Sequence, residues 1–537
     1  MKTCILALQR YERLGDLDEW IKYHLNIKFD KIFILDNNDE DNPLIYDDPC
    51  VEIIPYYGQR NGGTDWKWQR EAYNYGFDYI RSNYHNEYEW ISIIDIDEFI
   101  KLITCSDIKE FIQKELIDKN NDSLALKWEL YDDNNILYFD SSFEGQVQDT
   151  YKHSWKVNPS NNWNTPWEFK NMRLYTKFIG QFKDELYYNE SAHHPANALY
   201  ENETYYWKIC DANIAVCKHY KYKCLEDFIS KKCLLRNYVT SVHGSTWKYA
   251  RTYFEDNTIS LNKLLAFAQL EYKYKLNMTE WDIEYLQELF HKSLRIEYPI
   301  FSIWFGDFNS ISNDKRNFIL KCLNSVNKYA SDFSIIKLNE SNLHIDICPY
   351  VRFMYDHKQY GLCADFFKCL LLYYFGGIYM DLDVELIDYL MPYYKNNDYM
   401  LFDTSFYNRG AWFTKDHCIA SSFMMSKPFN KLFLEFINYC SSFTYDQLQE
   451  MYDTKSKKDF MDYFYDIKIF YYHVMCKNNI KVNYVQNIHY PVIKLNELDT
   501  ITLFDNRLVE PNKYHQHIDT FLIHHNIKTH EDIYFNN

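Results

Sequence analysis

Two pairs of aspartates stand at alternate positions, and each pair follows a short apolar run typical of a buried strand. The pairs are Asp95 with Asp97 and Asp381 with Asp383. Residues i and i+2 of a strand point to the same side, so each pair can face one divalent cation at the carboxyl end of its strand. Oxygen ligands from few residues suit Mg²⁺ or Mn²⁺ bridging a diphosphate better than they suit zinc. A single D-x-D is a weak signal, because two aspartates after a strand often form a solvated turn.

The segment before the second pair predicts how that pair is positioned. Residues 364–375 are apolar or aromatic at nearly every helical turn, with no helix breaker. Gly376 is well placed as a C-terminal cap, and Ile378, Tyr379 and Met380 form a short β-prone run. Helix, double glycine, buried strand and D-x-D therefore make one block.

Strand and helix patterns alternate before the first pair as well. Strands are expected at residues 2–7, 31–35, 50–55 and 90–94, and helices around residues 18–25 and 65–84. This alternation predicts a largely parallel sheet with helices on both faces. A second series begins with a strand at 300–304, a helix at 315–329 and a strand at 333–338. Residues 225–298 look helical and lack a D-x-D.

Composition and charge narrow the class of protein. A chain of 537 residues most simply forms two domains, with three as the alternative, and its content of 47% hydrophobic and 25% charged residues is typical of a globular protein. A net charge of −18 argues against a general nucleic-acid binder and against a purely electrostatic membrane anchor. The chain shows no apolar run of 18 residues and no signal-peptide pattern, so we expect it to be cytoplasmic. Contact with the inner face of the membrane would then occur through a lipid-linked acceptor. Its 14 cysteines lack C-x-x-C pairs, which favours free thiols.

The block ending at Asp383 resembles the D-x-D sugar-binding region of glycosyltransferase family 32. The family pattern is S-D-x-x-R-x-x-x-L-x-x-x-G-G-I-Y-x-D-x-D. This chain keeps Asp365, Tyr379 and both aspartates of that pattern, whereas Lys368 replaces the usual Arg. The family's W-F-G opening and its late I-H-H strand have counterparts here as well. The residues that this resemblance adds are Trp304, expected to stack on a nucleobase, and His524 and His525, expected near the metal or pyrophosphate.

The first 235 residues resemble the family 2-like and family 92 glycosyltransferases. The shared pieces are E-W-x-x-Y-H at residues 19–24, a strand ending in Asp36-Asn37, a helix with Gln69, and W-x-x-x-x-D-x-D-E-F at 90–99. The later K-H-Y segment places His219 where it could complete the metal site. These resemblances imply two GT-A-like, Rossmann-related nucleotide-sugar-binding domains of α/β class. The expected domains are 1–235 and 299–537, joined by a helical connector at 236–298.

The resemblances also imply roles for these residues. Metal would be held by Asp97 and Asp383, with Asp95 and Asp381 touching metal, ribose or sugar hydroxyls. Asp36 and Gln69 would bind the first donor. Asp365, Lys368 and Tyr379 would serve the second donor. An inverting first domain needs a carboxylate base, and the sequence does not rank the candidates Glu129, Asp132, Asp133 and Glu190.

Three classes of function compete at this point. The leading hypothesis is a bifunctional transferase that uses Mn²⁺ or Mg²⁺ and nucleotide sugars, most simply UDP-sugars, to extend a surface glycan or lipid-linked oligosaccharide. The first site would invert configuration and the second would retain it. The alternative is one active transferase whose other domain is a docking module. A haloacid-dehalogenase phosphatase also carries a strand-end D-x-D, but that pair opens its domain, and neither pair does so here.

Overall fold

The computed structural model divides into two compact units, Met1–Thr258 and Ile259–Asn537, and each is described by itself. The structure describes residues 1–57, 65–85, 87–152, 154–155, 176–188, 208–230, 253, 259–276, 280–294, 298–386, 388–396, 399–403, 419–455, 460, 482–483, 492–495, 499–504, 509–510 and 522–524. Within these ranges no helix is both long and apolar enough to cross a lipid bilayer.

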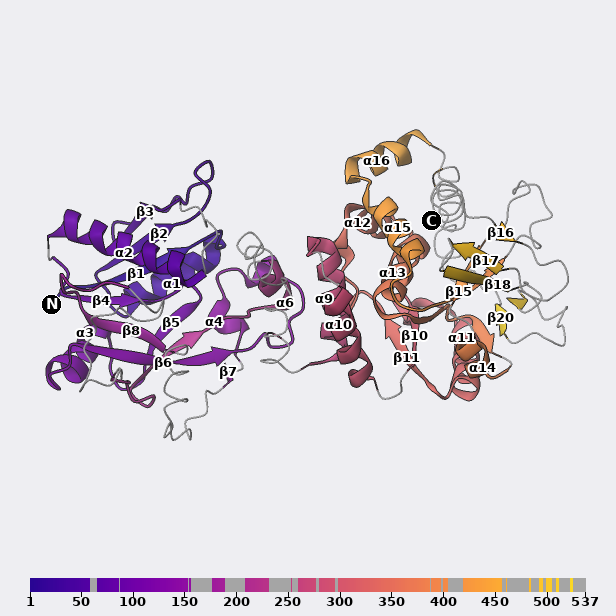
Figure 1. The fold of residues 1–537 in the computed structure, drawn as a ribbon, viewed down its shortest axis with the longest axis horizontal. Coiled ribbons are helices and arrows are strands. Elements are labelled where there is room, and N and C mark those ends of the chain that lie inside the picture. The colour runs from indigo at the N-terminus through magenta and orange to yellow at the C-terminus, as the bar shows by residue number, and fades with distance from the viewer. Residues whose placement is uncertain are drawn as a thin grey trace. The chain divides into compact units, whose positions relative to one another are not determined.

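The first unit is built on a nine-stranded mixed sheet (Figure 1). Its strands are β1 (Thr3–Gln9), β2 (Lys31–Asp36), β3 (Val51–Pro55), β4 (Trp90–Ile93), β5 (Glu98–Leu102), β6 (Ser123–Tyr131), β7 (Ser154–Trp155), β8 (Thr176–Gln181) and β9 (Ala215–His219). They lie in the order β3-β2-β1-β4-β8-β6-β9-β5, with β7 beside β6. The strands β3, β2, β1 and β4 are parallel, as the alternating pattern predicts. Beyond them β8 runs antiparallel to β4 and β6, and β5 antiparallel to β9, so the sheet is mixed rather than largely parallel.

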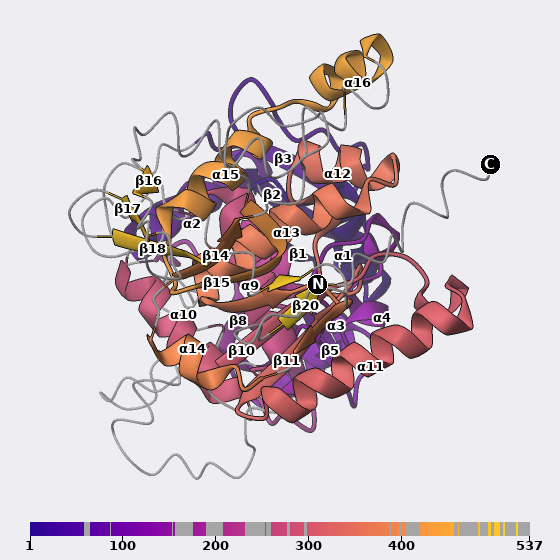
Figure 2. The ribbon, with the colours of Figure 1, turned by 90° about the vertical axis from the view of Figure 1, so that its right-hand side faces the viewer.

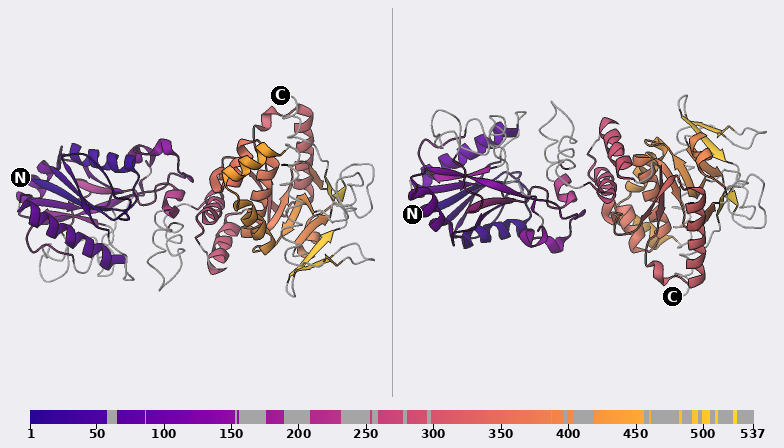
Figure 3. Two further views of the ribbon diagram at one scale, coloured as in Figure 1. Left: turned by 90° about the horizontal axis from the view of Figure 1, so that it is seen from above. Right: turned by 90° about the horizontal axis from the view of Figure 1, so that it is seen from below.

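Two helices, α1 (Leu14–Asn26) and α2 (Asp65–Tyr84), cover opposite faces of this sheet, and Figure 3 shows helices on both of its sides. Trp20 of α1 packs in the cluster that contains Ile5 of β1. Phe77 of α2 packs in the cluster that contains the neighbouring β1 residues on the other face. Shorter helices complete the unit, namely α3 (Ile108–Phe111), a π-helical turn (Ile112–Ile117), α4 (Val147–Thr150) and α6 (Leu225–Asp227).

A buried histidine in α1 makes the stability of the first unit depend on pH. His24 is fully buried, its Nδ1 lies 2.8 Å from the carbonyl oxygen of Trp20, and its Nε2 accepts from the Ile100 amide. Burial lowers the pKa of His24 to about 3 from an ordinary 6.5. The folded state therefore keeps this ring neutral, while the unfolded chain takes up a proton below pH 6.5.

We therefore expect the first unit to lose about 2 kcal/mol of unfolding free energy through His24 when the pH falls from 7 to 5. The stability is complete above pH 6.5 and is lost progressively as the pH falls toward 3. Urea unfolding of wild type and His24→Gln at both pH values measures the effect, since the variant lacks the titrating ring. Equal pH dependence in the two proteins would show that the ring does not stay neutral in the fold.

The second unit carries an eight-stranded mixed sheet in the order β11-β10-β12-β15-β14-β18-β17-β16 and a small sheet β13-β20-β19. The strands of the large sheet are β10 (Tyr298–Ile303), β11 (Phe333–Leu338), β12 (Gly377–Met380), β14 (Tyr399–Asp403), β15 (Ile419–Ser426), β16 (Val482–Asn483), β17 (Val492–Leu495) and β18 (Asp499–Phe504). The small sheet consists of β13 (Val384–Leu386), β19 (Val509–Glu510) and β20 (Leu522–His524). As in the first unit, parallel strands precede the D-x-D and an antiparallel strand, here β15, lies beside its strand.

Helices α11 (Asn313–Tyr329) and α13 (Tyr360–Phe375) pack on opposite faces of the large sheet, and Figure 2 shows them on either side of β10. Val326 of α11 packs with Ile378, whereas Lys368 of α13 lies over the ring of the next residue on β12, Tyr379. Further helices of this unit are α12 (Pro349–Asp356), α14 (Met391–Asn396), α15 (Lys431–Ser441) and α16 (Tyr445–Thr454).

The expected connector corresponds in part to the body of the second unit. Helices α9 (Leu261–Tyr274) and α10 (Glu280–Ser293) belong to that unit, and the boundary falls at residue 258 rather than 298. Gln269 of α9 is fully buried. Its side chain donates a hydrogen bond to the carbonyl of Asn342 and accepts one from the amide of His344. The apolar pattern of α9 therefore reflects burial on this unit and not a free-standing spacer.

The double glycine at the start of β12 turns the chain from α13 into the strand. Gly376 and Gly377 have φ angles of +64° and +90°. A Cβ on Gly377 would lie 2.7 Å from the backbone oxygen of Pro299, so this backbone approach requires glycine.

Gly377→Ala is expected to lower the unfolding free energy of the second unit by about 3 kcal/mol, because the backbone strain and the contact with Pro299 add. Gly361→Ala is the matched control, since no atom lies within 4 Å of its added Cβ and it stands in a helix. That control should stabilise by up to about 1 kcal/mol. Thermal unfolding of both variants measures the difference, and equal melting temperatures would contradict it.

Candidate functional site

The first D-x-D lies in the turn between β4 and β5, at the carboxyl end of β4, as the sequence predicts. Glu98 follows Asp97 directly and opens β5, where it pairs in register with His219, the last residue of β9. Cross-strand partners lie on the same face of a sheet. Strand pairing thus brings His219, far away in the sequence, to the D-x-D.

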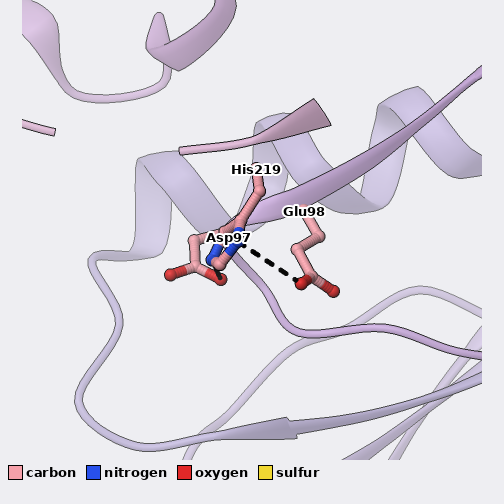
Figure 4. Close-up of side chains that lie close together, drawn as sticks. All are labelled: Asp97, Glu98 and His219. Carbon is pink, nitrogen blue, oxygen red and sulfur yellow. Dashed lines mark ion pairs between the residues drawn. The ribbon is translucent and has the colours of Figure 1, made fainter. Parts of the chain in front are cut away.

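Asp97, Glu98 and His219 form a compact cluster of metal-binding type (Figure 4). One ligand atom of each lies within 4.8 Å of the others. His219 Nε2 is 3.6 Å from Asp97 Oδ1, and its Nδ1 is 3.8 Å from Glu98 Oε1. The two ring nitrogens therefore face different carboxylates, and Nε2 with Asp97 offers a nitrogen and an oxygen to one cation.

The charge of this cluster suits a divalent cation. Glu98 is fully buried, and its Oε1 accepts no hydrogen bond among the described residues. Burial raises the pKa of Glu98 well above its ordinary value, Asp95 and Asp97 raise it further, and Lys177 acts in the opposite direction. A divalent cation among these carboxylates would offset their mutual repulsion and favour the charged form of Glu98.

Asp95 is held by donors from two other elements. Tyr73 of α2 donates its hydroxyl to Asp95 Oδ1 at 2.9 Å, and Lys177 of β8 donates to Oδ2 at 2.7 Å. Gln69, one turn before Tyr73, lies 3.5 Å from the same Oδ1. The structure thus joins the predicted residues Gln69 and Asp95, and it adds Tyr73, Lys177 and Glu98, to which the sequence reasoning assigned no role.

The second D-x-D follows β12 in a similar arrangement. The hydroxyl of Tyr379 donates to Asp381 Oδ1 at 2.7 Å, and the amide of Asp381 donates to the carbonyl of Ser422 on β15. Lys368 forms a buried ion pair with Asp365, and its ammonium lies 4.7 Å from the ring centroid of Tyr379. The first aspartate of each D-x-D therefore accepts a tyrosine hydroxyl.

The strand register repeats around both aspartate pairs. Val384 directly follows Asp383, opens β13 and pairs with His524 of β20. Glu98 directly follows Asp97, opens β5 and pairs with His219. His524 therefore holds the register position in the second unit that His219 holds in the first. His525 lies outside the described residues.

Trp304 lies near the second D-x-D in the sheet. It directly follows β10, which runs parallel to β12, so Trp304 and Asp381 stand at the same edge. Its ring makes an edge contact with Phe308 at 5.3 Å, and it is partly exposed.

Asp36 supports a loop in this structure. The carboxylate is fully buried and accepts from Gln9 and from the amides of Asn38 and Leu44. These hydrogen bonds shape the loop at residues 37–44, and the contact of Asp36 with a donor stays a prediction.

The candidate bases are separated by the fold. Glu129 pairs with Lys218, one residue before His219, so it lies on the opposite face of the β5-β9-β6 ladder from His219. Lys101 on that opposite face lies 3.5 Å from Glu129. Asp132 and Asp133 accept turn amides, and Asp133 is buried against Tyr253. Glu190 lies outside the described residues. The register thus places Glu129 on the face away from the metal cluster, and the identity of the base stays a prediction.

Comparisons with known proteins agree with the site chemistry. Residues 308–400 match the family model "Glycosyltransferase sugar-binding region containing DXD motif", which contains the second aspartate pair. The chain is similar to a glycosyltransferase family 92 protein of Ricinus communis, with 30% identity over 120 residues, which are 22% of this chain and 21% of that protein. It thus spans about a fifth of the length of that relative.

Among solved structures, PaToxG glycosyltransferase aligns with 33% of this chain, over 70% of its own length, at 13% identity and a TM-score of 0.23. The chain therefore contains a D-x-D glycosyltransferase sugar-binding region at 308–400, and over 120 residues it is distantly similar to a family 92 glycosyltransferase.

Proposed function

We propose that the chain is a metal-dependent glycosyltransferase with two GT-A-like nucleotide-sugar sites, one in each unit. The observation that carries the proposal is the repeated arrangement at the two D-x-D turns. In each, the turn follows a strand of a parallel set, a tyrosine holds the first aspartate, and a histidine pairs in register with the residue after the second aspartate.

Each site would use its aspartates differently. Asp97 with His219, and Asp383 with His524, would hold Mn²⁺ or Mg²⁺. A cation there supplies Lewis-acid neutralisation of the diphosphate leaving group. Asp95 and Asp381, held by their tyrosines, would orient the donor through ribose or sugar hydroxyls, and Trp304 would stack on the base of the second donor. These fixed positions cost no reorganisation when negative charge develops.

The finer assignments are part of the same proposal. The donors are UDP-sugars, the acceptor is a growing surface glycan or lipid-linked oligosaccharide in the cytoplasm, the first site inverts configuration and the second retains it. The second candidate is a single active transferase with a docking module. One sequence difference favours this second candidate. Lys368 stands where the family has arginine, and lysine lacks the planar guanidinium.

Metal removal tests the proposal directly. Hydrolysis of a panel of nucleotide sugars is expected to fall at least about 100-fold after EDTA treatment, because the diphosphate is then not neutralised. Added Mn²⁺ should restore the rate, and Ca²⁺ serves as the control cation. Hydrolysis that survives EDTA unchanged, or that is absent for every donor with and without acceptor glycans, would contradict the proposed function.

A further inference from the structure

A buried lysine contacts the carboxylates on both sides of Asp97. Lys177 of β8 is 1% exposed, and its ammonium lies 2.7 Å from Asp95 Oδ2 and 3.3 Å from Glu98 Oε2. Strand pairing explains its place, because Phe178 pairs with Ile93 and Lys177 is the next residue toward the D-x-D turn. A buried ammonium is tolerated only when it is paired.

This contact divides the carboxylates of the cluster into two groups. The two oxygens of Asp95 accept from Tyr73 and Lys177. Glu98 Oε2 accepts from the Asp95 amide at 2.8 Å and faces Lys177 as well. Asp97 Oδ1 instead lies toward His219 Nε2. The lysine thus binds the residues that flank Asp97 in the sequence and leaves Asp97 on the histidine side.

We propose that Lys177 is a positioning residue that keeps Asp95 Oδ2 and Glu98 Oε2 as internal acceptors, so that a divalent cation binds on the other side of the cluster, through Asp97 and His219. The inference rests on the metal site of the proposed function. It explains how three neighbouring carboxylates are given separate tasks: Asp97 binds metal, Asp95 orients the donor, and Glu98 faces the other nitrogen of His219.

Charge balance makes the role measurable. In Lys177→Met, Asp95 loses its cation and its Oδ2 becomes open to a metal. Mn²⁺ is therefore expected to bind about three-fold or more tightly, while donor turnover by the first unit falls. A residue with a merely structural role would weaken metal binding and turnover together. Asp95→Asn should weaken Mn²⁺ binding by about three-fold at most, through lost charge, whereas Asp97→Asn should weaken it at least about 30-fold, through a lost ligand.

The experiment measures free Mn²⁺ by electron paramagnetic resonance, without donor, on the full chain. Every protein carries Asp383→Asn, so that the first site dominates the difference between variants. The double variant Lys177→Met with Asp95→Asn removes both partners of the ion pair and should bind Mn²⁺ within about three-fold of the parent. It also replaces the single variant if Lys177→Met alone does not fold.

Four results would overturn the inference. The first is a loss of Mn²⁺ affinity in Asp95→Asn as large as that in Asp97→Asn, and the second is a folded Lys177→Met protein that binds Mn²⁺ no more tightly than the parent. The third is a double variant that binds Mn²⁺ as weakly as Asp97→Asn does, and the fourth is a parent that binds no Mn²⁺. Failure of the proposed function is distinct, because turnover of nucleotide sugars is measured separately. An intact Mn²⁺ pattern without turnover of any donor would reject the transferase and leave the role of Lys177 standing.

Discussion

Asp97→Asn is expected to lower turnover of the first unit's donor by about 10²- to 10³-fold, the equivalent of several kcal/mol of lost leaving-group stabilisation. The substitution keeps the shape of the side chain and removes the charge that faces His219 Nε2 at 3.6 Å. Initial rates at saturating Mn²⁺ measure the effect, and the loss should lie in kcat as well as in Mn²⁺ affinity, because charge builds on the diphosphate in the transition state.

Glu129→Gln is the matched control for this prediction. It removes one carboxylate from the same unit, but on the opposite face of the β5-β9-β6 ladder, and should change the rate by less than about three-fold. A rate for Asp97→Asn within that range would show that Asp97 does not hold a catalytic cation. A large loss for Glu129→Gln would restore it as a candidate base.

Asp16→Asn is expected to destabilise the first unit by about 3 kcal/mol, since it removes the nearer carboxylate of a buried lysine and leaves only Glu12, at 3.9 Å, to pair with it. Lys223 lies 2.6 Å from Asp16 Oδ2, and both residues are more than nine-tenths buried. Asp16 also accepts from the amide of Gly145. The pair joins the start of α1 to the segment after β9, so its loss should loosen the part of the fold that follows His219.

The exposed ion pair between Lys2 and Glu87 provides the comparison. Glu87→Gln should leave the unfolding free energy nearly unchanged, because solvent screens an exposed pair. Urea unfolding of both variants at pH 7 decides the point. Similar unfolding free energies for Asp16→Asn and Glu87→Gln would mean that Lys223 finds another partner or reaches water.

The sequence predicts the elements that position the aspartates but not their neighbours. The sequence predicts strand β4, the turn after it and the block around Gly376, because their signals are local. These signals are an apolar run, a glycine that ends the helix, and aspartates two residues apart. Tyr73 and Lys177 reach Asp95 from 22 and 82 residues away. A lysine on the same strand face as the buried Ile179 is the signal that could have pointed to a buried ion pair.

The register of the strand pairs decides which side chains share a face of the sheet, which the composition of the strands does not show. Glu129 and His219 are both near the end of their strands, and only the pairing of β6 with β9 shows that they lie on opposite faces. The apolar pattern of α9 predicts a helix correctly. A helix that is apolar on nearly all sides is normally buried in a domain, and α9 is buried in the second unit rather than standing apart as a spacer. Both outcomes depend on contacts between segments far apart in the sequence.

The central claim is that two working transferase sites share one chain. The most direct test compares metal-dependent turnover of a panel of nucleotide sugars by wild type, Asp97→Asn and Asp383→Asn, with acceptor glycans present. Each variant is predicted to lose a different donor and to keep the other. If one variant equals wild type on every donor while the other loses all turnover, the claim is contradicted and that variant's unit is a docking module.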